Sequence, residues 1–184
     1  MDRPEAAEPT GCWLLLSYRI PREPSRLRAT VWRRIKALGA IYLHNSVAAM
    51  PDSPDNERAL RTLRREIIEL GGSAQLMRSE ILAGANDLTS LYNATRDEEY
   101  TEIIDKCRDF LREIEKEITA NHFTYAELEE NDEDLKKLKS WFDKVDARDT
   151  LGAGERNDTL AALAECTSAL DAFAHHVYLA EDRD

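Results

Sequence analysis

The sequence has few cysteines and no long apolar run. Cys12, Cys107 and Cys166 are isolated and form no C-x-x-C pair, which disfavours a disulfide framework or a zinc knuckle and favours a reducing compartment. The apolar run Cys12–Leu16 is far shorter than the roughly 20 residues that cross a bilayer. The N-terminus, MDRPEAAEPTG, lacks the basic region and the apolar core of a signal peptide. We therefore expect a cytoplasmic protein without a membrane partner.

The sequence also lacks the short motifs on which many active sites are built. It contains no Gly-rich phosphate loop, no nucleophile elbow and no H-E-x-x-H pair. Asp171, His175 and His176 have the spacing of one helix face, but two histidines do not make a metal site, and an interaction with the helix dipole is the alternative. The numerous Asp and Glu residues have helix-surface spacing, which favours simple solvation. We expect no enzymatic activity, no metal and no cofactor.

Charge is distributed unevenly along the chain. Residues 1–83 carry 13 Lys and Arg against 10 Asp and Glu, a net charge of +3, whereas residues 84–184 carry 12 against 26, a net charge of −14. The total of −11 argues against a nucleic-acid partner for the chain as a whole. Because surface potential is local, the N-terminal half must be judged by itself.

The first half of the chain contains a predicted strand and a predicted helix. Residues 12–20 are apolar on both alternating faces, which is typical of a central strand covered on both sides. Pro24 or Ser25 then begins a helix. Its apolar residues recur at helical spacing up to a C-terminal Gly39, and they are Leu27, Val31, Ile35 and Leu38. Trp32 flanks this stripe, and we expect it to pack in the core.

The segments that follow complete a βαββαβ order. Residues 40–44 and 47–50 read as two strands joined by a tight turn at Asn45-Ser46. Residues 55–70 form a second amphipathic helix, and residues 73–81 a last strand. This order predicts an α+β, ferredoxin-like domain with both helices on one face of a four-stranded antiparallel sheet. The other face should be covered by the C-terminal helices or by a second subunit.

The second half of the chain reads as long helices. Apolar stripes recur over residues 100–118, 128–145 and 160–177, which predicts two or three antiparallel helices in a hairpin or small bundle. We therefore divide the chain into a disordered lead (residues 1–11), a ferredoxin-like domain (residues 12–83) and an acidic helical region (residues 84–184).

Basic side chains on the two predicted helices are the strongest functional signal. At about 100° per residue they fall opposite the apolar stripes, and they are Arg26, Arg33, Lys36, Arg58, Arg61 and Arg65. One hypothesis is that they contact DNA phosphates. The alternatives are a solvated face paired with Glu57, Glu66 and Glu69, or a site for an oxyanion such as chromate.

Several of these segments resemble the N-terminal domain of the ChrB family of bacterial proteins, which are encoded with chromate transporters. The resemblance covers roughly residues 12–180, and its most specific segments are 18–21, 24–25, 31–40 and 47–51. It implies a regulatory protein linked to chromate or oxidative-stress resistance, which binds DNA and forms a dimer. Full-length members add a C-terminal domain, so a chromate-sensing role located there does not carry over. The alternative is a protein-interaction module without DNA affinity.

The order of elements is also similar to that of the CRISPR-adaptation nuclease and of the related domain in PaaX-type repressors. In that nuclease an Asp at the end of the first strand helps to hold a divalent metal. The corresponding residues here, Ser17 to Pro21, include no carboxylate, and Arg19 would repel the metal. A metal-dependent nuclease is therefore disfavoured.

Overall fold

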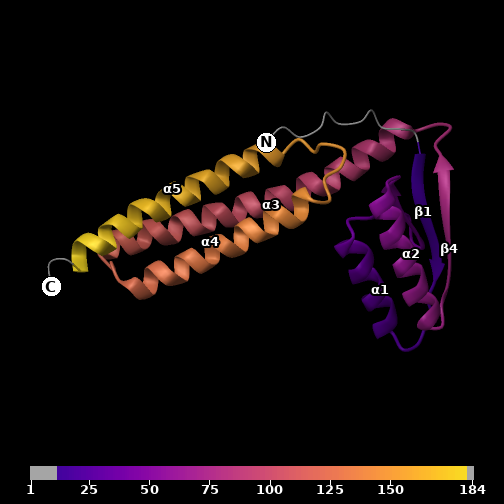
Figure 1. The fold of residues 1–184 in the computed structure, drawn as a ribbon, viewed down its shortest axis with the longest axis horizontal. Coiled ribbons are helices and arrows are strands. Elements are labelled where there is room, and N and C mark those ends of the chain that lie inside the picture. Colours follow the sequence, from indigo (N-terminus) through magenta and orange to yellow (C-terminus); the bar gives the residue numbers. More distant parts are fainter. Residues whose placement is uncertain (1–11, 182–184) are drawn as a thin grey trace. The chain divides into compact units, whose positions relative to one another are not determined.

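The computed structural model describes residues 12–181, which form an α+β structure of four strands and five helices (Figure 1). Residues 1–11, the predicted disordered lead, lie outside the described residues. In chain order, the elements are β1 (Cys12–Arg19), α1 (Arg26–Ala37), β2 (Ile41–His44), β3 (Val47–Pro51), α2 (Pro54–Glu69), β4 (Ser73–Glu80), α3 (Ala85–Ala120), α4 (Tyr125–Asp146) and α5 (Arg156–Glu181).

The strands form one antiparallel sheet in the order β2-β3-β1-β4. β1 is central, and Leu14 lies opposite Met50 of β3 on one side and Arg78 of β4 on the other. The turn at residues 45–46 joins β2 to β3, as the sequence predicts. This topology confirms the ferredoxin-like fold.

Both faces of β1 carry buried side chains, and different elements cover them. On one face Leu14 and Leu16 pack in a core with residues of α1 and α2 such as Val31 and Leu60, so both helices cover the same side of the sheet (Figure 1). On the other face Trp13 is buried, and its ring meets Tyr92 of α3 edge-on with the centroids 5.8 Å apart. The prediction of a strand covered on both sides is confirmed.

The turn between α2 and β4 brings the backbone at position 72 so close to its neighbours that only glycine fits there. A Cβ atom on Gly72 would lie 2.5 Å from the carbonyl oxygen of Arg19 and 3.0 Å from Cγ2 of Ile67. Since the nearest atom belongs to the backbone of the central strand, β4 would have to shift. We expect Gly72→Ala to lower the free energy of unfolding by about 1–3 kcal/mol, as measured by urea denaturation. The exposed Ser73→Ala is the control, and equal midpoints for the two variants would contradict the prediction.

The remaining helices form a bundle of three. Tyr100 and Ile103 of α3, Phe142 and Val145 of α4, and Phe173 of α5 belong to one buried cluster. Figure 1 shows α3, α4 and α5 lying alongside one another. The small-bundle alternative is therefore confirmed over the hairpin. No helix within residues 12–181 is long and apolar enough to cross a membrane.

A buried carboxylate fixes the loop between α4 and α5. Asp149 is fully buried, and one of its oxygens accepts hydrogen bonds from the backbone N–H groups of Gly152 (2.9 Å) and Ala153 (3.0 Å). The hydroxyl of Tyr100 donates to the other oxygen at 3.3 Å. Burial, followed by the charge of Asp149, raises the pKa of Tyr100 well above its ordinary value. The hydroxyl therefore remains a hydrogen-bond donor at physiological pH.

The chain divides into two compact units at a boundary inside α3, between Thr95 and Arg96. The first turns of α3, including Tyr92, belong to the unit that contains the sheet. The remainder of α3 belongs with α4 and α5.

Candidate nucleic-acid interface

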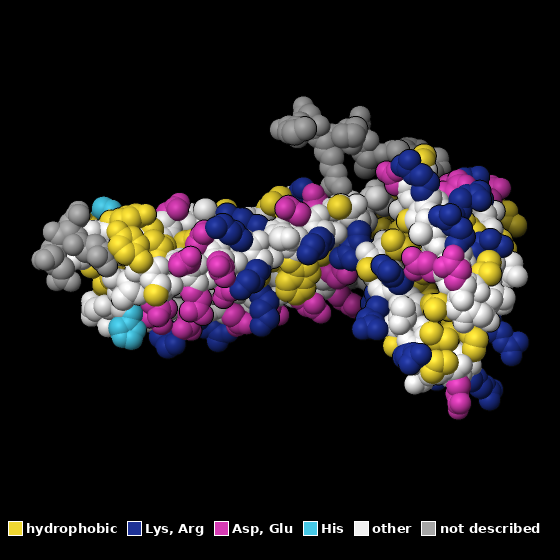
Figure 2. All heavy atoms as spheres, turned by 60° about the horizontal axis from the view of Figure 1, so that its bottom comes forward, with side chains coloured by type: hydrophobic (Ala, Val, Ile, Leu, Met, Phe, Trp, Pro, Cys, Tyr) yellow, Lys and Arg dark blue, Asp and Glu magenta, His cyan; other side chains and the backbone are white. Residues whose placement is uncertain are grey.

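Five arginines from two neighbouring elements surround a cavity of about 880 Å³ in the sheet unit. We call this set the α2–β4 arginine surface; it consists of Arg58, Arg61, Arg64 and Arg65 of α2 and Arg78 of β4. Glu57 also lines the cavity. In the view of Figure 2, dark-blue Lys and Arg side chains are spread over the sheet unit, with acidic and apolar side chains between them. The cavity is therefore lined by more positive than negative charge.

The sequence of α2 accounts for the position of these arginines. Leu60, Leu63 and Ile67 are buried against the sheet, so residues at other positions around the helix face solvent. Ser53 caps the helix by accepting a hydrogen bond from the N–H of Asn56 at 3.1 Å, which fixes where the first turn begins. The Nε atom of Arg64 donates to the carbonyl oxygen of Ala74 at 3.0 Å and so links α2 to β4.

Most of the arginine surface is already engaged in ion pairs. Arg58 pairs with Asp55, and Arg61 pairs with Glu57 at 2.7 Å. Arg78 bridges Asp52 and Glu57 at 2.7 Å each. The hydrogen bond and the charge of Arg61, followed by those of Arg78, lower the pKa of Glu57. The hydrogen bond to Asp52 is the main cause that raises the pKa of Arg78.

The arginine side chains of these ion pairs are exposed and can therefore exchange partners, although the carboxylates of Asp52 and Glu57 are largely covered. The side chains of Arg58 and Arg61 are 77% and 68% exposed, and ion pairs of exposed side chains contribute little to stability because water screens them. Arg65 donates to the hydroxyl of Thr62 at 3.3 Å. A polyanion could therefore take the place of the carboxylates at little cost in folding free energy.

A family model described as "Protein ChrB, N-terminal" matches residues 28–184. The chain belongs to the ChrB N-terminal family. It is also similar to Protein ChrB of Cupriavidus metallidurans, with 32% identity over 71 residues. That stretch covers 39% of this chain and 22% of the relative, so the match spans well under half of the length of the curated relative. The resemblance noted in the sequence is thereby confirmed.

In this ChrB-family chain, the predicted basic residues fall into two groups. Arg58, Arg61 and Arg65 lie together around the α2–β4 cavity. Arg26, Arg33 and Lys36 are exposed on α1 and are not among the residues that line that cavity. The two helices are linked by an ion pair of 3.5 Å between Arg34 and Glu66. Glu57 pairs with Arg61 of α2, and both this pair and the Arg34–Glu66 pair agree with the alternative of a solvated basic face paired with glutamates.

Two arginines of the surface were not predicted from the sequence, and one tryptophan was predicted in the wrong environment. Arg64 is adjacent to Arg65 in the sequence, but it was not among the predicted site residues. Arg78 lies on β4, and the pairing of β4 with β1 brings it to the surface. Trp32 was expected in the core, and this was wrong, because its side chain is 52% exposed. Its neighbours Val31 and Ile35 take the buried positions of α1.

The described part of this ChrB-family chain offers no ready-made metal centre. Within residues 12–181, no three His, Cys, Asp or Glu side chains are grouped so that they could hold a metal ion. His176 instead stacks on Phe123 with the ring centroids 5.1 Å apart.

Proposed function

We propose that this ChrB-family chain is a regulatory protein linked to chromate or oxidative-stress resistance, and that it binds DNA through the α2–β4 arginine surface. The observation that carries the proposal is the convergence of five arginines and one glutamate on one cavity. Guanidinium groups bind phosphate oxygens through paired, charge-assisted hydrogen bonds. The phosphate backbone supplies most of the salt-dependent affinity of such proteins for DNA.

Residues outside the cavity extend this proposal. Arg26, Arg33 and Lys36 on α1 are exposed cations, and they would contact the DNA backbone beyond the α2–β4 arginine surface. A homodimer, or a complex with a protein partner, is also part of the proposal, because two-fold assemblies present the same surface to two half-sites.

The salt dependence of binding tests the proposal. The test is a gel shift with the region upstream of the protein's own operon at 50 mM and 200 mM salt. If the five arginines of the α2–β4 arginine surface neutralise five phosphates, they alone give a slope of log K against log salt of about −4.5, so the affinity should fall at least roughly 500-fold between the two concentrations. Contacts from the three cations of α1 would make the slope steeper. Absence of any shift at the lower concentration, with a chain that shows the circular dichroism of folded helices, would refute DNA binding.

A protein-interaction module without DNA affinity is the second candidate. Arg58, Arg61 and Arg78 already have carboxylate partners, and two apolar side chains in the same part of the chain, Ile68 and Met77, are 44% and 42% exposed. A mixed surface of this composition suits a protein partner with acidic and apolar groups. This candidate predicts no affinity for DNA, and it predicts that charge reversal at Arg58, Arg61 and Arg65 leaves the function of the protein unchanged.

A further inference from the structure

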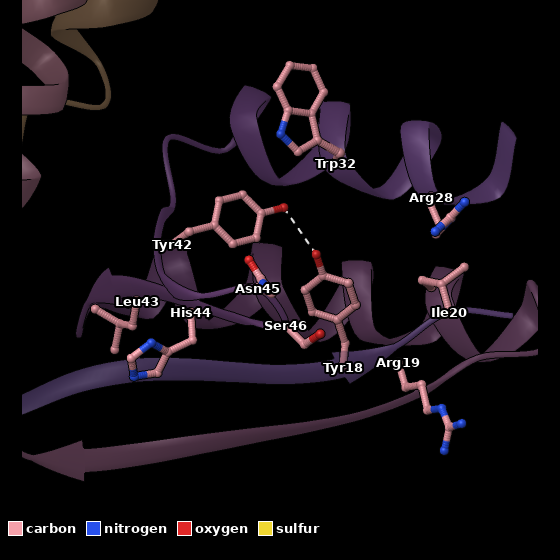
Figure 3. Close-up of a pocket in the computed structure, with 10 residues that line it drawn as sticks. All are labelled: Tyr18, Arg19, Ile20, Arg28, Trp32, Tyr42, Leu43, His44, Asn45 and Ser46. Atoms are coloured by element: carbon pink, nitrogen blue, oxygen red, sulfur yellow. Dashed lines mark hydrogen bonds between the residues drawn. The ribbon is translucent and has the colours of Figure 1, made fainter. Parts of the chain in front are cut away.

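A second cavity, of about 580 Å³, lies in the sheet unit beside α1 and the β2–β3 turn, and its lining is chemically different from that of the arginine surface. We call it the tyrosine pocket and define it by Tyr18, Tyr42, Arg28, Trp32 and Ser46. All ten of its lining residues, shown in Figure 3, are neutral or basic. A cavity with this lining favours an anionic ligand over a cationic one.

Two tyrosine hydroxyls meet inside this pocket and provide a hydrogen-bond donor. The Oη atoms of Tyr18 and Tyr42 are 3.1 Å apart, and Figure 3 shows the two side chains directed toward each other between α1 and the strands. Only one of their two hydrogens is needed for the bond between them, so the other can be donated to a ligand. Burial, followed by the bond with Tyr18, raises the pKa of Tyr42 far above its ordinary value, and this hydroxyl therefore stays protonated.

Arg28 and Trp32 add a cation and an aromatic surface on α1. They are four residues apart on the helix and therefore lie on the same side of it. Figure 3 shows both projecting from α1, whereas Arg19 points away from the tyrosine pair. Trp32 is 52% exposed, which is unusual for a large aromatic side chain. Its indole is therefore available to pack against a ligand.

The size of the pocket decides which class of anion fits. Cavities of about 300–1,000 Å³ are typical of sites for small organic molecules, and the tyrosine pocket is within that range. A tetrahedral oxyanion of five heavy atoms would occupy a small fraction of this volume and would leave Trp32 without a contact. A planar ring that carries one anionic group would use the cation, the hydroxyl pair and the indole together.

We propose that the tyrosine pocket binds a small organic anion with a planar aromatic ring. The anionic group would accept hydrogen bonds from Arg28 and from one tyrosine hydroxyl, and the ring would pack on Trp32. This site is separate from the α2–β4 arginine surface, so it does not depend on whether the chain binds DNA.

Three probes test this proposal by isothermal titration calorimetry with the full chain. They are 2-naphthoate, its neutral counterpart 2-naphthamide, and inorganic phosphate. We expect saturable binding of 2-naphthoate with a Kd at least tenfold lower than that of either other probe, because hydrogen bonds to a charged group are stronger than those to a neutral group and phosphate cannot pack on the indole. Equal binding of 2-naphthoate and 2-naphthamide, equal binding of 2-naphthoate and phosphate, or no saturation would overturn the proposal.

Variants on α1 locate the binding. Arg28→Gln should raise the Kd for 2-naphthoate at least tenfold, whereas Arg33→Gln, an exposed position on the same helix that does not line the pocket, should leave it within twofold. Both positions are exposed, so neither change should disturb folding, and matching thermal melts would verify this. If the two variants bind 2-naphthoate equally well, the pocket is not the site.

Discussion

Replacement of Arg58, Arg61 and Arg65 together by Glu should weaken DNA binding at least 100-fold. Each change removes a cation from the α2–β4 arginine surface and places a carboxylate against phosphate. Loss of three phosphate contacts should also reduce the salt slope by about 2.7. The measurement is fluorescence anisotropy with a labelled duplex at several salt concentrations.

The bundle supplies a matched control for this charge reversal. Lys106, Arg108 and Arg112 of α3 are also exposed cations in ion pairs with residues of their own helix. Their replacement by Glu changes the net charge by the same amount, and we expect less than a threefold effect on affinity. If both triple variants lose affinity equally, overall charge governs binding and the α2–β4 arginine surface is not the interface. If neither variant loses affinity, the α2–β4 arginine surface does not contact the DNA, and if the unmodified chain shows no affinity, the interaction-module candidate is favoured.

Phe173→Ala should be among the most destabilising single substitutions in the bundle. Phe173 is fully buried, and its ring lies 5.9 Å from that of Phe123 between centroids. Truncation of a buried phenylalanine removes its apolar surface and leaves a cavity, which costs about 3–5 kcal/mol. Guanidinium denaturation followed by far-UV circular dichroism should therefore show a clearly earlier loss of helix.

Leu160→Ala is the matched control for Phe173→Ala. Leu160 is on the same helix, α5, but is 39% exposed, so its truncation should cost less than about 1 kcal/mol. Equal shifts of the midpoint for the two variants would show that Phe173 does not lie in the bundle core.

Much of the fold could be predicted because local signals agreed with tertiary packing. Gly39 has a positive φ of 77° after α1, and glycine in this conformation commonly ends a helix. Pro54 lies in the first turn of α2, where proline is favoured. The residue types at these positions therefore indicate where the helices end and begin. The residues of β1 are apolar on both faces of the strand, which predicts burial on both sides, and the buried Trp13 and Leu14 confirm this. Helix ends and strand faces depend on residues that are close together in the chain, so they can be predicted from the sequence.

The candidate sites could be predicted only in part, because they depend on residues that are distant in the chain. Arg78 joins Glu57 across 21 positions, and Tyr18 meets Tyr42 across 24. Helical spacing alone grouped Arg58, Arg61 and Arg65, whereas the convergence of α2 with β4 required the register of the sheet. Trp32 was predicted in the core but is exposed, because hydrophobicity alone does not indicate whether an aromatic side chain at the edge of an apolar stripe is buried.

The continuity of α3 affects how the protein can be dissected genetically. The helix runs without interruption from Ala85 to Ala120, and its first turns bring Tyr92 against Trp13 of the central strand. A chain cut after residue 83 would keep every strand but would strip the indole of Trp13 of this cover and expose it to water. A fragment intended to report on the sheet alone should therefore extend to Thr95, where the first compact unit ends.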